Sequence, residues 1–296
     1  MRPYSNREER ISGFLMVLPA FVMLAIFVIT PLGLALYRSF FDYRVGQESA
    51  FVGFANYAKI LDNDVFFKSF INVLEMTLAI TVFQIVCSFL FANALVRIKG
   101  KFGVFARTII YLPYLISGIV VAVIFTLLTT YNGGIINAFL GVFDIEPIPF
   151  NNSEFWSPIS IIVPTIWIGF GYFSLVMYAG LINIPKSFFE AAEMDGASFF
   201  QLTRFITIPM MKNYFLLLIV TLIVANMQMF EVPMIMTNGQ PANQTMTPVL
   251  YLIHSRANGN ISDSEITAAA ILIMVLILIV NSFVFKLFSR RGRWEL

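Results

Sequence analysis

The segment Gly13–Tyr37, GFLMVLPAFVMLAIFVITPLGLALY, contains no charged residue. It is long enough to cross a bilayer, because a spanning helix needs about 20 mostly apolar residues. The whole chain of 296 residues has the same character: 58% of the residues are hydrophobic, only 12% are charged, and the mean hydropathy is +0.81. A soluble domain is about half apolar and a quarter charged. The sequence therefore predicts an integral membrane protein.

Six segments are apolar and long enough to span the membrane, which predicts an all-α fold of six transmembrane helices. They are Gly13–Tyr37, Val73–Leu95, Thr108–Leu128, Ile159–Ile182, Tyr214–Met236 and Ala268–Phe288. The first is too long for the apolar region of a signal peptide and no A-x-A-like site follows it, so we expect it to remain as a span. We expect three regions: residues 1–70 with the N-terminal tail, first span and external loop, a transmembrane core at 71–288, and a cytoplasmic tail at 289–296.

The lysines and arginines are unevenly divided between the two sets of loops, and cytoplasmic loops are the ones enriched in them. One set of loops and both termini hold fourteen: Arg2, Arg7, Arg10, Arg97, Lys99, Lys101, Arg107, Lys186, Arg204, Lys212, Lys286, Arg290, Arg291 and Arg293. The other set holds five: Arg38, Arg44, Lys59, Lys68 and Arg256. This asymmetry predicts that both termini are cytoplasmic, and that the loop between the fourth and fifth spans is cytoplasmic too.

That loop contains SFFEAAEMDGASFFQLTRFITIPMMK, Ser187–Lys212, which is more polar than its surroundings. Ser187 followed by Glu190, and Ser198 followed by Gln201, have the spacing of helix-starting capping boxes. Gly196 between them can adopt the left-handed conformation that ends a helix. The sequence predicts two short helices with a sharp turn at Gly196. On these grounds alone the segment is either a docking element for another protein or an ordinary capped interfacial loop.

The segment resembles the EAA motif of permeases from binding-protein-dependent ABC importers, E-A-A-x-x-D-G-A followed by I-x-L-P. The matching residues are Glu190, Ala191, Ala192, Asp195, Gly196, Ala197, Ile206 and Pro209, with Ile208 in place of the usual leucine. Thr237–Thr245, TNGQPANQT, is similar to a T-G-G-G-P segment of maltose-transporter-type sugar permeases, with Asn238 and Gln240 replacing two glycines. The first span is also similar to that of the subfamily.

The resemblance implies a type I ABC importer permease fold in a bacterial or archaeal plasma membrane. It implies that the coupling segment 187–209 docks in a groove of a cytoplasmic ATPase, where Glu190 meets a basic residue and Gly196 permits the turn. No G-x-x-x-x-G-K-[ST] sequence occurs in the chain, so ATP and Mg would be used by a separate dimer of ATPase subunits. The other implied partners are a second homologous permease and an extracytoplasmic solute-binding protein, which together with the spans would move a sugar or oligosaccharide.

The substrate path is predicted around the fourth and fifth spans, where maltose-type permeases contact sugar. Asn226, Gln228 and Glu231 lie in VANMQMFEVP, and helical periodicity places Gln228 and Glu231 on one face. Pro233 is expected to disturb the helix just beyond them. Trp167 and Tyr172 in IWIGFGYFSLVMY would offer aromatic faces to sugar rings. The alternative is that Asn226 and Gln228 join helices and that Tyr172 is packing.

Other functions have less support in the sequence. The single histidine, His254, excludes a histidine-rich metal site or a Ser-His-Asp triad, and we expect neither catalytic residues nor a cofactor in this chain. The net charge of +2 does not favour nucleic-acid binding. A proton-coupled transporter using Glu75 or Glu231 remains an alternative, but it leaves the coupling segment unexplained. A permease for another polar solute, of the glycerol-phosphate type or an amine, is a second alternative.

Overall fold

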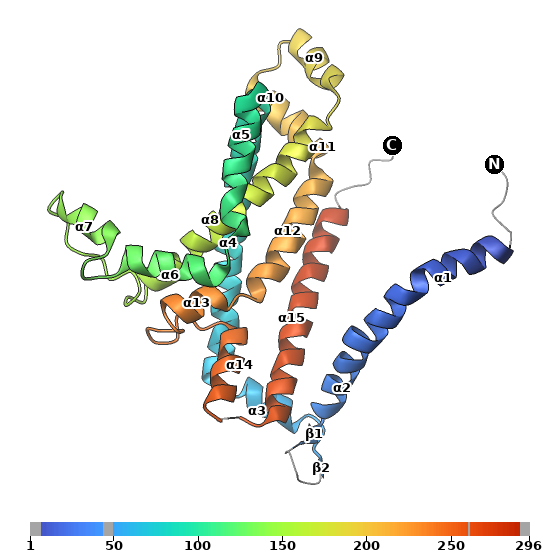
Figure 1. Ribbon diagram of the computed structural model, residues 1–296, viewed down its shortest axis with the longest axis vertical. Coiled ribbons are helices and arrows are strands. Elements are labelled where there is room, and N and C mark those ends of the chain that lie inside the picture. Colours follow the sequence, from blue (N-terminus) through green and yellow to red (C-terminus); the bar gives the residue numbers. More distant parts are fainter. Residues whose placement is uncertain (1–6, 44–49, 260, 291–296) are drawn as a thin grey trace. The chain divides into compact units, whose positions relative to one another are not determined.

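The computed structural model describes residues 7–43, 50–259 and 261–290, which form two compact units. One unit contains residues up to 63 together with 254–274, and the other contains residues 64–253 and those from 275 onward. Of the predicted cytoplasmic tail at 289–296, residues 291–296 lie outside the described part. Nearly all of the described chain is helical, as the composition predicts (Figure 1).

Five helical segments are long and apolar enough to cross a membrane: Ile11–Arg38, Asp64–Arg97, Trp156–Ile182, Lys212–Met236 and Asp263–Phe288. A sixth span results if the bent pair Gly100–Leu115 and Gly118–Thr129 is one crossing. Each of the six sequence segments has its counterpart here. The third predicted segment, Thr108–Leu128, falls on this bent pair, whose two halves meet at 93°.

In the first unit, a span built of α1 (Arg7–Leu24), a π-helical turn η1 (Ala25–Ile29) and α2 (Thr30–Arg38) leads into a short hairpin. Strands β1 (Phe41–Asp42) and β2 (Ala50–Phe51) pair antiparallel, and α3 (Ala55–Leu61) follows them. No residue from 11 to 38 is buried. The apolar side chains of this span therefore face lipid or another chain rather than a core of their own.

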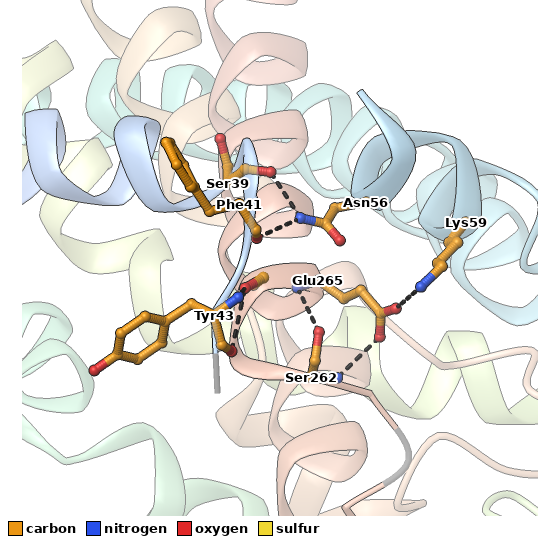
Figure 2. Close-up of polar contacts among 8 residues, drawn as sticks. Ser39, Phe41, Tyr43, Asn56, Lys59, Ser262 and Glu265 are labelled. Atoms are coloured by element: carbon orange, nitrogen blue, oxygen red, sulfur yellow. Dashed lines mark hydrogen bonds and ion pairs between the residues drawn. The ribbon is translucent and has the colours of Figure 1, made fainter. Parts of the chain in front are cut away.

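A polar network ties the hairpin of this unit to the start of α15 (Asp263–Arg290), as Figure 2 shows. Buried Asn56 donates to the carbonyls of Ser39 and Phe41, at 2.9 and 3.0 Å. The Tyr43 amide donates to Ser264 Oγ at 2.7 Å. Lys59 Nζ lies 3.0 Å from Glu265 Oε1, and Glu265 also caps its own helix by accepting from the Ser262 amide. Because these polar groups satisfy one another, the short strands need no large apolar core.

The second unit is built around two long helices, α4 (Asp64–Arg97) and α8 (Trp156–Ile182), which pack along each other. The other elements of the unit are α5 (Gly100–Tyr111), a 3₁₀ turn η2 (Leu112–Leu115), α6 (Gly118–Thr129), α7 (Ile135–Gly141), α9 (Lys186–Met194), α10 (Phe199–Leu202), a π-helical turn η3 (Thr203–Thr207), α11 (Ile208–Met210), α12 (Lys212–Met227) and α13 (Glu231–Met236). α14 (Pro248–Ala257) and α15 each begin in one unit and end in the other.

Two apolar clusters hold this unit together. One joins α4, α8 and α12 through Ala92, Met177 and Leu222. The other joins α4, α6, α8 and α13 through Ile80, Ala122 and Val232. Since lipid tails are as apolar as these side chains, close packing rather than removal from water stabilises such contacts.

Glycines allow α8 to approach its neighbours closely. A Cβ on Gly171 would overlap the carbonyl oxygen of Ile110 in α5, and a Cβ on Gly169 would overlap the side-chain amide of Gln84 in α4. Small residues have this role at many helix contacts in membranes. The G-x-G spacing in IWIGFGYF is therefore explained by packing on two sides of α8.

Candidate coupling segment and substrate path

The coupling segment contains the two short helices that its sequence predicts. α9 ends at Met194, and Gly196, two residues further on, has a φ of +79° in the left-handed region. The amide of Gly196 donates to the Glu193 carbonyl at 3.0 Å, and the amide of Ala197 donates to the Ala192 carbonyl at 2.9 Å. These two bonds form a Schellman motif, which favours glycine at its left-handed position. The predicted turn at Gly196 is confirmed.

One of the two predicted capping boxes is confirmed and the other is wrong. The Ser198 amide donates to Gln201 Oε1 at 2.7 Å, and Ser198 Oγ accepts from the Gln201 amide at 3.4 Å, so both halves of the second box are formed. α9 instead begins one residue before Ser187, with Pro185 at the N-cap position and no side-chain cap. Because the helix starts earlier than predicted, Ser187 lies in its first turn rather than at the N-cap, and the proline at the N-cap has no side-chain acceptor.

Most of the segment is exposed, with Thr207 as its one buried residue. No residue of α9 is buried, and Met194 and Phe200 are 88% and 69% exposed. Glu190, Glu193 and Asp195 are exposed too, and none of them has an ion pair within the described part of the chain. A hollow of about 260 Å³ lies between the two helices, lined by Ala192, Asp195, Gly196, Ala197, Gln201, Leu202, Phe205 and Ile206. In Figure 1 α9 lies at one end of its unit. The surface combines uncompensated negative charge with exposed apolar side chains.

Two of the residues predicted to line the substrate path, Gln228 and Glu231, lie in or directly after a break of the helical backbone. α12 ends at Met227 and α13 begins at Glu231, so Gln228 is exposed in an irregular connection. The prediction that Gln228 and Glu231 share one helical face is therefore wrong, because no continuous helix joins them. Pro233 is the third residue of α13, where a backbone amide would have no partner within the helix. The break in the helix therefore lies before Pro233, not after it.

Glu231 lies at the break in the third span. A Cβ on Gly118, the first residue of α6, would overlap Glu231 Oε2. Ile116 and Ser117, just before it, have extended backbone conformations between η2 and α6. The carboxylate therefore lies against the N-terminal end of α6, where the helix dipole favours negative charge. The sequence did not identify Gly118 as a site residue.

Tyr172 stacks on Tyr114, with ring centroids 4.6 Å apart and an interplanar angle of 12°. Tyr114 belongs to η2, only four residues from Gly118, and is 41% exposed. Along the chain, the stacked tyrosine Tyr114 thus lies just before the bend of the third span, and the contact of Gly118 with Glu231 lies just after it. Tyr114 is a second residue that the sequence did not identify, because hydropathy alone does not reveal a bend inside an apolar run.

The remaining two candidates have different surroundings. Trp167 is 40% exposed and contacts the ring of Phe125 in α6 at a centroid distance of 5.7 Å. Asn226 is buried, and its Nδ2 has no hydrogen-bond partner within the described residues. The amide nitrogen of Asn226 therefore does not join two helices by a hydrogen bond within the described residues, contrary to the alternative interpretation. A buried donor without a partner costs about 1–3 kcal/mol, so a water or a solute hydroxyl would stabilise this position.

Comparison with known proteins decides the family. Residues 84–294 match the family described as binding-protein-dependent transport system inner membrane component. The chain belongs to this family. It is a multi-pass inner-membrane transport component, and the EAA segment is characteristic of the family to which it belongs.

Two curated relatives of this transport component are similar over most of their length. The sulfoquinovosyl glycerol transport system permease protein of Agrobacterium fabrum is 29% identical over 248 residues, which cover 82% of this chain and 80% of the relative. The lactose transport system permease protein of Rhizobium radiobacter is 29% identical over 283 residues, covering 92% and 93%. Among solved structures, a bacterial alginate ABC transporter in complex with an alginate pentasaccharide-bound periplasmic protein has the same fold, with a TM-score of 0.82, 21% identity and full coverage of both chains.

Proposed function

We propose that this chain is one of two permease subunits in an ATP-driven importer of saccharides, with six spans and both termini in the cytoplasm. The observation that carries the proposal is the exposed segment from α9 to α10, where three carboxylates without an ion pair among the described residues precede a structured turn. A rigid acidic element of this kind is suited to docking with a basic groove, since charge-assisted hydrogen bonds are the stronger ones. Its match to the EAA motif indicates that the groove belongs to an ATPase.

The ATPase is proposed to be a separate dimer that binds ATP and Mg. Glu190 would contact a basic side chain of one ATPase subunit, while Ala191, Ala192 and Ala197 would keep the surface low enough for the helix to enter its groove. Gly196 and Asp195 would hold the turn. Backbone hydrogen bonds fix the turn at Gly196 and Ala197. A movement of the docked helix would therefore be transmitted to α12 rather than absorbed in the loop.

A second permease is the proposed partner within the membrane. The span Ile11–Arg38 has a hydropathy of 2.6 and no buried residue, so its whole apolar surface is available to lipid and to another chain. A single chain with one coupling segment would engage only one subunit of an ATPase dimer. A soluble binding protein outside the membrane is proposed to deliver the substrate, as the family description implies.

The proposed substrate is a neutral saccharide. Glu231 already places a carboxylate at the N-terminal end of α6, so an anionic solute at this point would be repelled rather than attracted. Irregular backbone at membrane depth is tolerated where it lines a cavity, and both breaks, at 116–117 and 228–230, have this character. Tyr114, Tyr172 and Trp167 would offer aromatic faces. The name of the lactose permease also contains a neutral sugar.

Assembly tests this proposal. The tagged chain, purified in mild detergent from the cells that naturally produce it, should bring with it a second permease and two copies of an ATPase. Addition of lactose-loaded or maltose-loaded binding protein should raise the rate of ATP hydrolysis. A transport-competent homodimer without any ATPase would overturn the proposal and would favour proton coupling through Glu231.

A further inference from the structure

The connection between α6 and α8, residues 130–155, is a folded element rather than a loose loop. Asn137 of α7 is buried and organises it. Its Nδ2 donates to the carbonyls of Thr130, Tyr131 and Ile148, at 3.2, 3.4 and 3.0 Å, and its Oδ1 accepts from the Ile148 amide at 2.9 Å. One side chain therefore fastens the two ends of the connection to each other.

A pocket of about 230 Å³ lies beside this anchor. It is lined by Thr129, Thr130, Tyr131, Asn132, Pro149, Phe150, Asn151 and Asn152. The lining contains two aromatic rings, three side-chain amides and three hydroxyls, and no carboxylate, ammonium or guanidinium group. Sites for drug-sized ligands have volumes of about 300–1,000 Å³, so this smaller pocket suits one sugar ring rather than an oligosaccharide.

One amide of the pocket, that of Asn151, is held in a defined position. Asn151 Nδ2 donates to Thr129 Oγ1 at 3.0 Å, and Thr129 Oγ1 in turn donates to the Phe125 carbonyl at 2.7 Å. Asn151 Oδ1 is buried and has no hydrogen-bond partner within the described residues, so the pocket wall contains an unused acceptor. Asn132 is exposed and takes no part in the hydrogen bonds that hold the connection together.

We propose that this pocket is a second saccharide-binding site, which holds one neutral sugar ring of the cargo outside the membrane before it enters the path between the spans. Amides and hydroxyls match the alternating donors and acceptors of a sugar ring, and the rings of Tyr131 and Phe150 match its C–H faces. The absence of charge in the lining fits a neutral ligand. The inference rests on the proposed function, because that function places residues 130–155 on the external side.

The fluorescence of Trp156 provides a direct readout, since its ring lies 5.6 Å from that of Phe150 between centroids. The intact complex in lipid nanodiscs, without binding protein, is titrated with lactose and separately with maltose. The proposal expects a saturable change in emission with at least one of the two sugars. The change should be absent in Trp156→Phe, which removes only the reporter.

Two variants and a control define the site. Asn132→Ala removes a pocket amide without disturbing the anchor, and it should weaken sugar binding about fivefold, as loss of one neutral hydrogen bond does. Asn151→Ala should weaken it at least as much. Glu154→Gln, exposed and outside the lining, should leave it unchanged. In uptake assays, Asn132→Ala should raise the substrate concentration needed for half-maximal rate and leave the maximal rate intact.

Three results would overturn the inference: no emission change with either sugar, equal binding by Asn132→Ala and the unaltered protein, or a loss of binding-protein docking in Asn132→Ala without any effect on sugar binding. The last would make the pocket a protein contact. The first two results leave ATP-driven uptake intact, and the third impairs uptake only in Asn132→Ala. Failure of the proposed function is distinguishable from all three, because ATP-driven uptake is then absent in the unaltered protein.

Discussion

The carboxylate of Glu231 lies against Gly118, so closely that even a methyl group on Gly118 would overlap Glu231 Oε2. Each residue is the first of a helix that resumes after a break, Gly118 in α6 and Glu231 in α13. A negative charge at a helix N-terminus stabilises it by about 0.3–1 kcal/mol. The two interrupted spans therefore stabilise each other at the point where their backbones are irregular.

Gly118→Ala should displace the Glu231 carboxylate while the protein stays folded, because the atom in the way is the far end of a flexible side chain. If Glu231 binds a substrate hydroxyl, the KM for uptake should rise about tenfold or more, since hydrogen bonds to charged groups contribute about 1.5–3 kcal/mol. Gly141→Ala, where an added Cβ meets nothing within 4 Å, is the matched control. An unchanged KM in Gly118→Ala would remove Glu231 from the substrate path.

Gly171→Ala should behave differently, because its Cβ would overlap a backbone carbonyl, that of Ile110, which has little freedom to move. Overpacking commonly costs about 1–3 kcal/mol, and separation of α5 from α8 would add to this. The expected result is a lower yield of folded complex and a lower midpoint in thermal unfolding followed by size-exclusion chromatography. A midpoint equal to that of the unaltered protein would show that α5 and α8 lie further apart than described.

Glu190→Lys should leave membrane insertion and thermal stability unchanged, because Glu190 is exposed and unpaired in the described structure. It should abolish the stimulation of ATP hydrolysis by loaded binding protein, since it places a cation against the proposed basic groove. Glu193→Lys changes the charge of the same helix by the same amount. Comparison of the two variants therefore shows whether the effect depends on the contact made by Glu190 or only on the charge of the helix. Equal and normal ATPase stimulation in both variants would mean that α9 is only a connecting loop.

Sidedness follows from the unequal distribution of lysine and arginine. Cys87 is the only cysteine, so its replacement by alanine allows single cysteines to be introduced elsewhere. In intact cells, a membrane-impermeant maleimide should label Glu146→Cys and not Glu193→Cys, and both positions are exposed in the structure. The reverse labelling pattern would place the coupling segment outside and would contradict the proposed docking with a cytoplasmic ATPase.

The apolar segments, the turn at Gly196 and the Ser198 capping box could be predicted from sequence because each depends on residues close together in the chain. The breaks after Leu115 and Met227 could not, because Ile116 and Gln228 interrupt apolar runs whose hydropathy is that of an ordinary span. The contact of Glu231 with Gly118 depends on those breaks, and so does the stacking of Tyr114 on Tyr172. Helical periodicity consequently misplaced Gln228 relative to Glu231.

The central claim is that ATP hydrolysis by a separate subunit drives saccharide uptake through this chain. The most direct test is uptake of radiolabelled lactose or maltose by proteoliposomes containing the purified complex, with loaded binding protein and ATP supplied on opposite sides of the membrane. We predict uptake that requires both, that continues in the presence of a protonophore, and that stops when Glu190→Lys replaces the unaltered chain. Uptake that persists without ATP and stops on addition of the protonophore would contradict the account.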